Sequence, residues 1–400
     1  MSSSRNECIA IMDVFPVKIW SPVAAHPPPS TFLLALTTKV CCWAWARSSR
    51  RIVEMTSLDS SMYIRGQPYA QLFHAYPVLK PLYFSFEKQY NPLPILDFMA
   101  SNNYSIPITV VIVYLSLCYY GTNYMKNRKS LNIGSQLATW NLLLALFSIY
   151  GTIRTLPHFL HKLSAMTFEE SVCESAATYF GAGAAGLSVQ LFILSKIPEL
   201  FDTAFIILRK KPLIFLHWYH HVTVLLYCWN SYVTESGAGI YFVTMNYAVH
   251  AIMYTYYYLH AIKRLPNWFR SWIVTSLQIL QMIIGTCIVT ASLYYYIYGG
   301  RKYAPKECNN NLSNVIVGVV IYSSYLFLFL EYATKRFVYG AENSSVKGNK
   351  KLWLLTETFN RNTVTTFMKK TECSTPNIAL LYIIITFFNI FQRMPLVKNS

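Results

Sequence analysis

The chain has 400 residues, of which 54% are hydrophobic and only 13% are charged. So few charged side chains cannot coat a soluble globule, which excludes a typical soluble enzyme, a disordered chain and a collagen-like fibre. Lys and Arg number 34 against 17 Asp and Glu, a formal net charge of +17. In a membrane protein, this surplus favours anchoring at the cytoplasmic leaflet over nucleic-acid binding, so no nucleic-acid partner is expected.

Seven apolar stretches approach the length of about 20 residues that a helix needs to cross a bilayer. They predict an all-α integral membrane protein with seven transmembrane helices, at residues 107–120, 136–153, 178–194, 213–229, 240–259, 272–297 and 315–332. The third stretch is rich in Gly and Ala, which predicts close helix packing there. The nine cysteines include no CxxC pair, so neither a zinc site nor a dense disulfide framework is expected.

Basic residues between the stretches predict the orientation. One alternating set of connections carries 12 Lys and Arg and the other set carries 5, so the first set is expected in the cytosol. The region before the first span then lies on the lumenal side, as do the glycosylation sequons at Asn103 and Asn311. Cys173 and Cys308 fall in two loops of the same oxidising side and could form a disulfide.

Two regions lie outside this pattern. Residues 1–85 form an N-terminal extension of unknown role, with an apolar run at 32–45 that Lys39 interrupts. That extension fits a targeting segment, a surface helix or sequence wrongly joined to the gene. Residues 341–400 form a C-terminal extension of unknown role, which leaves 86–340 as the membrane domain.

Polar side chains within the predicted spans are costly and by default indicate function. His217, His220 and His221 have the spacing i, i+3, i+4, which places them on one face of a helix. Asn246 and His250 lie four residues apart in the next span. Three histidines on one face, beside a span that carries Asn and His, are hard to explain by packing alone.

Further polar residues flank this cluster. Just before the fourth span, a proline allows a helix break, and Lys196 can pair with Glu199 along one turn. Gln278 and Gln281 lie one turn apart in the sixth span, where interhelical hydrogen bonding would also explain them. Isolated histidines elsewhere, and the tyrosines after His250, are read as packing residues.

A histidine cluster in a membrane suggests two kinds of chemistry. Membrane di-iron oxygenases need about eight histidines, by comparison with that family, and too few lie in these spans. A single metal remains open, because His is the commonest metal ligand. The other reading is organic: imidazole can act as base, acid or nucleophile, while a neighbouring His, Asn or Gln stabilises an oxyanion.

The motifs together resemble the ELO-type fatty acid elongases, over about residues 86–340. They are KIPEL at 196–200 followed by Asp202 and Thr203, HWYHH at 217–221, NYAVH at 246–250 with MYTYY at 253–257, and TSLQILQ at 275–281. Trp218 and Tyr219 within the histidine motif, FEKQYN at 86–91 and Pro212 resemble the branch that extends saturated and monounsaturated chains. The polyunsaturated branch usually has Gln at the position of Pro212.

The resemblance implies a fold in which six of seven helices enclose a narrow acyl-chain tunnel, with a lumenal disulfide between Cys173 and Cys308. The implied enzyme is a very-long-chain 3-oxoacyl-CoA synthase, which condenses an acyl-CoA with the co-substrate malonyl-CoA and releases CO2 and CoA. It implies no cofactor and no metal. It also implies residence in the endoplasmic reticulum membrane, and as partners membrane lipid, a ketoacyl-CoA reductase and the other enzymes of the elongation cycle.

Residue roles follow from the same resemblance. His220 is the expected nucleophile, with His250 as its partner across the tunnel, and His217 and His221 orient or protonate. Asn246 and Gln281 are expected to hold the oxygen atoms of the thioester or enolate, and Lys196, Glu199 and Asp202 to shape the cytosolic mouth. Arg209, Lys210 and Lys211 are expected to meet the CoA phosphates. Tyr254 and Gln278 are also expected to bind substrate.

Two other functions remain open at this point. A mononuclear His-ligated membrane oxygenase or hydroxylase would retain iron or zinc through purification. A non-enzymatic seven-span transporter or receptor would spread its polar residues along a pathway, whereas here they concentrate in three spans.

Overall fold

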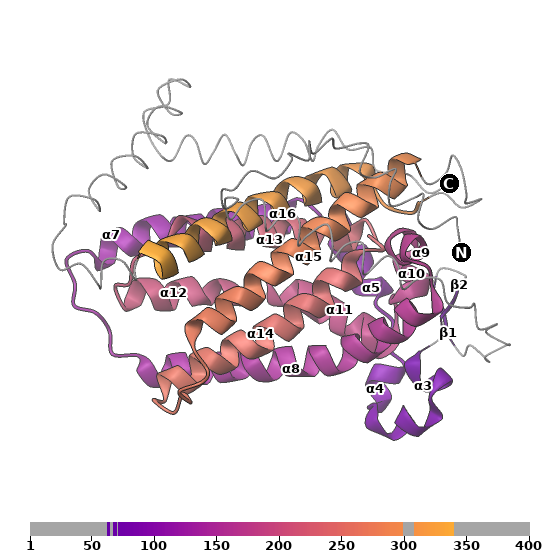
Figure 1. Cartoon of the computed structure of the whole chain (residues 1–400), viewed down its shortest axis with the longest axis horizontal. Coiled ribbons are helices and arrows are strands. Elements are labelled where there is room, and N and C mark those ends of the chain that lie inside the picture. The colour runs from indigo at the N-terminus through magenta and orange to yellow at the C-terminus, as the bar shows by residue number, and fades with distance from the viewer. Residues whose placement is uncertain (1–61, 65–66, 70, 299–307, 340–400) are drawn as a thin grey trace, which may run out of the picture. The chain divides into compact units, whose positions relative to one another are not determined.

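The computed structural model describes residues 62–64, 67–69, 71–298 and 308–339 (Figure 1). The chain divides into two units at Phe329 and Leu330. The second unit contributes the end of the last helix and the turn η5 (Thr334–Tyr339) to the described part. The apolar run at 32–45 and the extension 341–400 lie outside the described residues.

The described residues are almost entirely helical. The short elements are the antiparallel strands β1 (Met62–Ile64) and β2 (Gln67–Tyr69), and the α-helices α3 (Leu72–Ala75), α4 (Ser85–Lys88), α7 (Thr122–Met125), α9 (Phe168–Cys173) and α10 (Ala176–Tyr179). They also include the 3-10 helices η1 (Pro77–Leu82) and η3 (Pro198–Leu200) and the π-helix η2 (Leu117–Gly121). The longer helices are α5 (Leu93–Ser101), α6 (Ser105–Ser116), α8 (Gly134–Ala165), α11 (Gly183–Ser195), α12 (Phe201–Leu208), α13 (Phe215–Val233), α14 (Gly239–Ala261), α15 (Ser271–Tyr298) and α16 (Leu312–Ala333).

Four helical stretches of the described chain are long and apolar enough to cross a membrane: Ser105–Met125, Gly134–Ala165, Ser271–Tyr298 and Leu312–Phe337. They contain four of the seven predicted spans, so the chain is a multi-pass helical membrane protein. The predicted spans 213–229 and 240–259 coincide with α13 and α14, which have 19 and 23 residues. At 1.5 Å per residue these are about 28 and 34 Å long, close to the thickness of a bilayer core.

The third predicted span, 178–194, differs from the structure at its start. The chain leaves helical geometry after α10, and α11 begins only at Gly183, whose φ is +57°. A Cβ on Gly183 would collide with the side chain of Gln71, so only glycine fits this turn. Beyond α11 the helix breaks at Pro198, where a break was predicted, and resumes as α12.

The core forms where α14 packs along α8 and against α15, with α11 between α8 and α13. Figure 1 shows these long helices with their axes roughly aligned. Trp229, Ile240 and Tyr247 are each at most 2% exposed. The ring of Tyr247 occupies the space where Gly151 lacks a Cβ, which lets α8 and α14 approach closely. This packing fixes the helices that carry the candidate site.

The packed region begins before residue 86, the predicted start of the domain. Tyr69, Leu72 and Phe73 are buried, and Gln71 donates a hydrogen bond from Nε2 to the carbonyl of Lys88. This arrangement places part of the predicted N-terminal extension, from β2 onward, within the folded unit.

An ion pair then anchors the same segment to α8. Arg154 donates to both carboxylate oxygens of Glu87, from Nε at 2.8 Å and from Nη2 at 3.0 Å, and the Tyr150 hydroxyl donates to Glu87 at 2.6 Å. Burial alone would raise the pKa of Glu87. The bonds from Arg154, Tyr150 and the Phe84 backbone N–H outweigh burial and hold this pKa below its usual range.

Candidate functional site

Helix α13 carries the predicted histidine cluster. It begins at Phe215, after Ile214 in extended conformation, so all three histidines lie in its first two turns. The rings of His217 and His221 pack edge to face with centroids 4.5 Å apart, and His220 and His221 lie 5.7 Å apart. The structure therefore brings the three predicted side chains together on one helix.

Helix α14 carries the second half of the cluster. Asn246 lies one turn before His250, and its Nδ2 is 3.2 Å from Nε2 of His250. The rings of His250 and Tyr254 pack edge to face with centroids 5.3 Å apart. His250 and Asn246 thus form a hydrogen-bonded pair, as their spacing of four suggested.

Lys196 was expected at the cytosolic mouth, and the structure shows that its side chain is buried. Lys196 and Glu199 are only 2% and 5% exposed. Nζ of Lys196 lies 2.7 and 2.9 Å from the two carboxylate oxygens of Glu199 and 3.3 Å from Oδ1 of Asn246. Because α11 ends beside α14, the pair that was predicted from spacing forms in the interior, next to the His250 pair.

Asp202 was also expected at the mouth. It accepts hydrogen bonds from the Trp140 indole at 2.6 Å and from the Tyr254 hydroxyl at 2.9 Å. Tyr254 is 3% exposed, so this carboxylate is tied to α8 and α14 and links three helices.

A second network was not predicted. Oγ1 of Thr203 lies 2.9 Å from Nε2 of His217 and 2.9 Å from the hydroxyl of Tyr114, and Thr203 is fully buried. The Asp-Thr pair at 202–203 was the only sequence signal for Thr203. Nothing in the sequence pointed to Tyr114, which lies on α6, 89 residues earlier.

The four histidines differ in which ring nitrogens are occupied. In the described residues, Nε2 of His217 is bonded to Thr203 and Nε2 of His250 to Asn246, whereas the ring nitrogens of His220 and His221 have no hydrogen-bond partner. Of these two, His220 packs against Tyr325, which lines the cavity described below. Neither ring nitrogen of His220 is among the polar atoms of the described residues that are fully buried and lack a hydrogen-bond partner. His220 therefore has a ring nitrogen free for a substrate.

The other predicted residues are placed as follows. Nε2 of Gln278 lies 3.3 Å from the sulfur of Met253, and Gln281 is buried at 5% exposure on α15. Arg209, Lys210 and Lys211 follow α12, but Nζ of Lys210 donates to the carbonyls of Lys126 and Arg128, at 3.0 Å each. Lys210 therefore holds the loop before α8, whereas it was expected to meet CoA phosphates.

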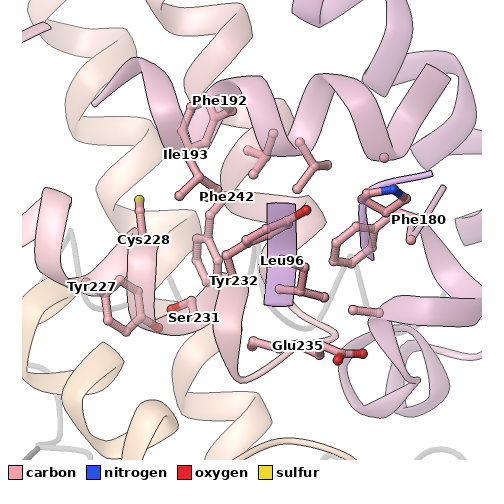
Figure 2. Close-up of a pocket in the computed structure, with 18 of the residues that line it drawn as sticks. Leu96, Phe180, Phe192, Ile193, Tyr227, Cys228, Ser231, Tyr232, Glu235 and Phe242 are labelled. Carbon is pink, nitrogen blue, oxygen red and sulfur yellow. The ribbon is translucent and has the colours of Figure 1, made fainter. Parts of the chain in front are cut away.

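A mostly apolar cavity runs beside this cluster, lined by residues of α5, α10, α11, α13, α14 and α16 (Figure 2). Its space is about 970 Å³, including the part open at its mouth. Figure 2 shows Phe180 and Glu235 toward one end, and Phe192 and Cys228 toward the other. Nearest the histidines the lining includes Val224, Tyr325 and Asn246.

Two contacts connect the cavity with the histidine cluster. The ring of Tyr325 packs against His220 with centroids 5.0 Å apart, and Asn246 is bonded to His250. The cavity wall thus contacts His220 and His250 directly. Within the described residues, no group of three or more His, Cys, Asp or Glu has an arrangement that would hold a metal ion.

The predicted lumenal features have different outcomes. Cys173 and Cys308 are joined in a disulfide, and the neighbouring Asn309 N–H donates to the carbonyl of Cys173. Asn103 is only 8% exposed, and its glycosylation stays a prediction. Asn311 is half-buried and accepts a hydrogen bond from the N–H of Asn314, and its glycosylation stays a prediction.

Comparison with known proteins identifies the family of the chain. The model of the ELO family, described as the GNS1/SUR4 family, matches residues 99–345. Very long chain fatty acid elongase 6 of Drosophila melanogaster is 42% identical over 228 residues, 56% of this chain and 70% of the relative. The protein of the same name from Gallus gallus is 37% identical over 64% of this chain and 92% of its own length. Fatty acid elongase 3 of Trypanosoma brucei brucei is 36% identical over 60% and 87%. The chain therefore belongs to the ELO (GNS1/SUR4) family and is a fatty acid elongase.

Proposed function

We propose that this elongase condenses a long saturated or monounsaturated acyl-CoA with malonyl-CoA through an acyl group carried by His220. The observation that carries the proposal is the contact between the apolar cavity and both halves of the histidine cluster. An apolar space that ends at paired imidazoles suits a substrate with a long hydrocarbon chain and a reactive carbonyl at its head.

The first half of the reaction transfers the acyl group. The free ring nitrogen of His220 attacks the thioester carbonyl, the C–S bond breaks, and the proton from the imidazole goes to the departing CoA thiolate. An acyl-imidazole and CoA result. His217 and His250 are less suited to this attack, because the Nε2 atom of each is already bonded.

The second half forms the carbon–carbon bond. The malonyl carboxylate leaves as CO2, and the resulting enolate attacks the carbonyl of the acyl-imidazole. The C–N bond breaks to give 3-ketoacyl-CoA, and the imidazole recovers one proton, so the overall reaction consumes a proton. Burial of the site keeps water from hydrolysing the acyl-imidazole.

The substrate parts then have defined places. The acyl chain occupies the cavity, where each buried methylene contributes about 0.8 kcal/mol. Arg209 and Lys211, beyond α12, are assigned to CoA phosphates. Lys210 is left out of this set because its Nζ is held by backbone carbonyls.

We infer that this chain resides in the endoplasmic reticulum membrane, which it crosses seven times, with its N-terminal side in the lumen. The surplus of Lys and Arg in the loops assigned to the cytosol supports this orientation. So does the disulfide, because both of its cysteines lie in loops assigned to the lumen. A ketoacyl-CoA reductase is the expected partner, because the 3-keto product must be reduced before the next cycle.

The test is condensation in membranes that contain the full chain, with palmitoyl-CoA and labelled malonyl-CoA and without NADPH. Labelled 3-ketoacyl product that is absent with His220→Ala supports the proposal. Mass spectrometry of the enzyme incubated with acyl-CoA alone tests the carrier: an acyl adduct on His217 or His221 would overturn the assignment to His220.

A further inference from the structure

The environment of Lys196 fixes the orientation of one amide. Nζ of Lys196 lies 3.3 Å from Oδ1 of Asn246, and an ammonium group has three donors and no acceptor. The atom of Asn246 that faces Lys196 must therefore be the oxygen, because an NH2 group there would place two donors against each other. The NH2 group of Asn246 consequently faces His250.

This orientation determines the protonation of the histidine ring. Nδ2 of Asn246 carries only donors and lies 3.2 Å from Nε2 of His250, so that nitrogen must accept and be unprotonated. The structure assigns His250 to the neutral form with its proton on Nδ1, and we propose that Lys196, acting through Asn246, is the positioning residue that sets this tautomer. The proposal deepens the proposed function and rests on it for the identity of the substrate.

Lys196 is itself held in place for this role. Its ammonium group bridges both oxygens of Glu199, Ser195 donates to the same carboxylate at 2.7 Å, and the ring of Phe192 lies 4.0 Å from Nζ. A cation that is 2% exposed would be costly alone, and the carboxylate and the aromatic face offset that cost. The ammonium group therefore faces Asn246 from a fixed position.

The consequence for catalysis is a division of roles. With Nε2 occupied, His250 cannot receive a proton there without losing its bond to Asn246. Nδ1 of His250 has no hydrogen-bond partner among the described residues, and it is not among their fully buried, unpaired polar atoms. His250 then acts as a hydrogen-bond donor to a developing oxyanion, while His220 carries the acyl group.

Solid-state NMR of the full chain in lipid vesicles, labelled with nitrogen-15 histidine, measures the tautomer directly. The His250 signal, identified by its loss in His250→Gln, should show a protonated Nδ1 and an unprotonated Nε2. A protonated Nε2 in the wild-type protein overturns the proposal. This readout does not depend on condensation activity, so failure of the proposed function and failure of the tautomer assignment are distinguishable.

Two sets of variants test the chain of contacts. Asn246→Asp presents only acceptors, so it should move the proton of His250 to Nε2 and lower kcat by 10³- to 10⁴-fold, the order seen when a catalytic histidine is held in the wrong tautomer. Asn246→Ala imposes no tautomer and should lose only about 10-fold. The double variant Lys196→Met with Glu199→Gln leaves no lone charge and should give a mixture of tautomers.

The control is Asn141→Asp, a buried asparagine of α8 that bonds only to the carbonyl of Leu137. It should leave the His250 signal unchanged. Equal losses of kcat in Asn246→Asp and Asn246→Ala, or an unchanged tautomer in the Lys196 and Glu199 double variant, would show that Lys196 has only a structural role.

Discussion

Cys228 offers a way to shorten the cavity from inside. Its side chain lines the cavity on α13, eight residues after His220, which is about 12 Å along the helix axis. The lining continues past it to Tyr232 and Glu235. Replacing Cys228 with Phe places a ring in the path of the acyl chain and leaves the histidines in place.

The size of the effect follows from the apolar area that the chain can still bury. Each methylene kept out of the cavity loses about 0.8 kcal/mol, which is about fourfold in kcat/KM. A ring that excludes three methylenes should therefore lower kcat/KM by about 60-fold for the longest substrates. Acyl chains that end before residue 228 should react as in the wild-type protein.

A panel of saturated acyl-CoAs of increasing length, each with labelled malonyl-CoA, measures this profile. Cys118→Phe is the matched control, because Cys118 is a free, half-buried cysteine that does not line the described cavity. A uniform loss at every chain length in Cys228→Phe would refute the reasoning, and so would an unchanged profile from folded protein.

Three further outcomes are expected. His220→Ala should abolish 3-ketoacyl product while the variant elutes as the wild-type protein does in size-exclusion chromatography; residual condensation above a few per cent would contradict it. Replacing both Cys173 and Cys308 with Ser opens a loop closed over 135 residues and should cost about 2–5 kcal/mol, measured as a lower Tm without reductant. Glu87→Gln leaves Arg154 buried without its counter-charge and should cost about 3–5 kcal/mol. The pKa of Glu87 is lower in the folded than in the unfolded protein, so this stabilisation is present above the unfolded pKa of about 4.3 and is lost as the pH falls through the folded pKa. A difference in Tm between wild type and Glu87→Gln that stays constant as the pH is lowered through this range would contradict it.

The sequence predicted best what periodicity determines. Four of the seven apolar stretches lie in helices that meet the length and composition of a span, and α13 and α14 coincide with two more. The spacing of His217, His220 and His221 placed them on one face because an α-helix repeats every 3.6 residues. The Lys196–Glu199 pair, three residues apart, also followed from local geometry.

What failed depended on neighbours that are distant in sequence. The start of α11 required knowing that Gln71 fills the space beside Gly183. The sequon at Asn103 gave no sign that this side chain is buried, because its burial depends on how the loop between α5 and α6 packs. Glu87 and Arg154 lie 67 residues apart, so neither spacing nor composition revealed that they are partners.

Among the polar residues that surround these histidines, Asn246 lines the apolar cavity, whereas Thr203, Lys196 and Glu199 do not. Thr203 bonds His217, Asn246 bonds His250, and Lys196 is neutralised by Glu199 next to Asn246. Thr203, Asn246 and Lys196 thus each have a partner that is not the substrate, which limits the cost of placing them in a membrane. The ring nitrogens of His220 and His221 have no partner in the described chain, and of these two histidines His220 packs against Tyr325 of the cavity wall. An imidazole left without a protein partner beside an apolar cavity is stabilised most when a substrate carbonyl reaches it, which is where a nucleophile is needed.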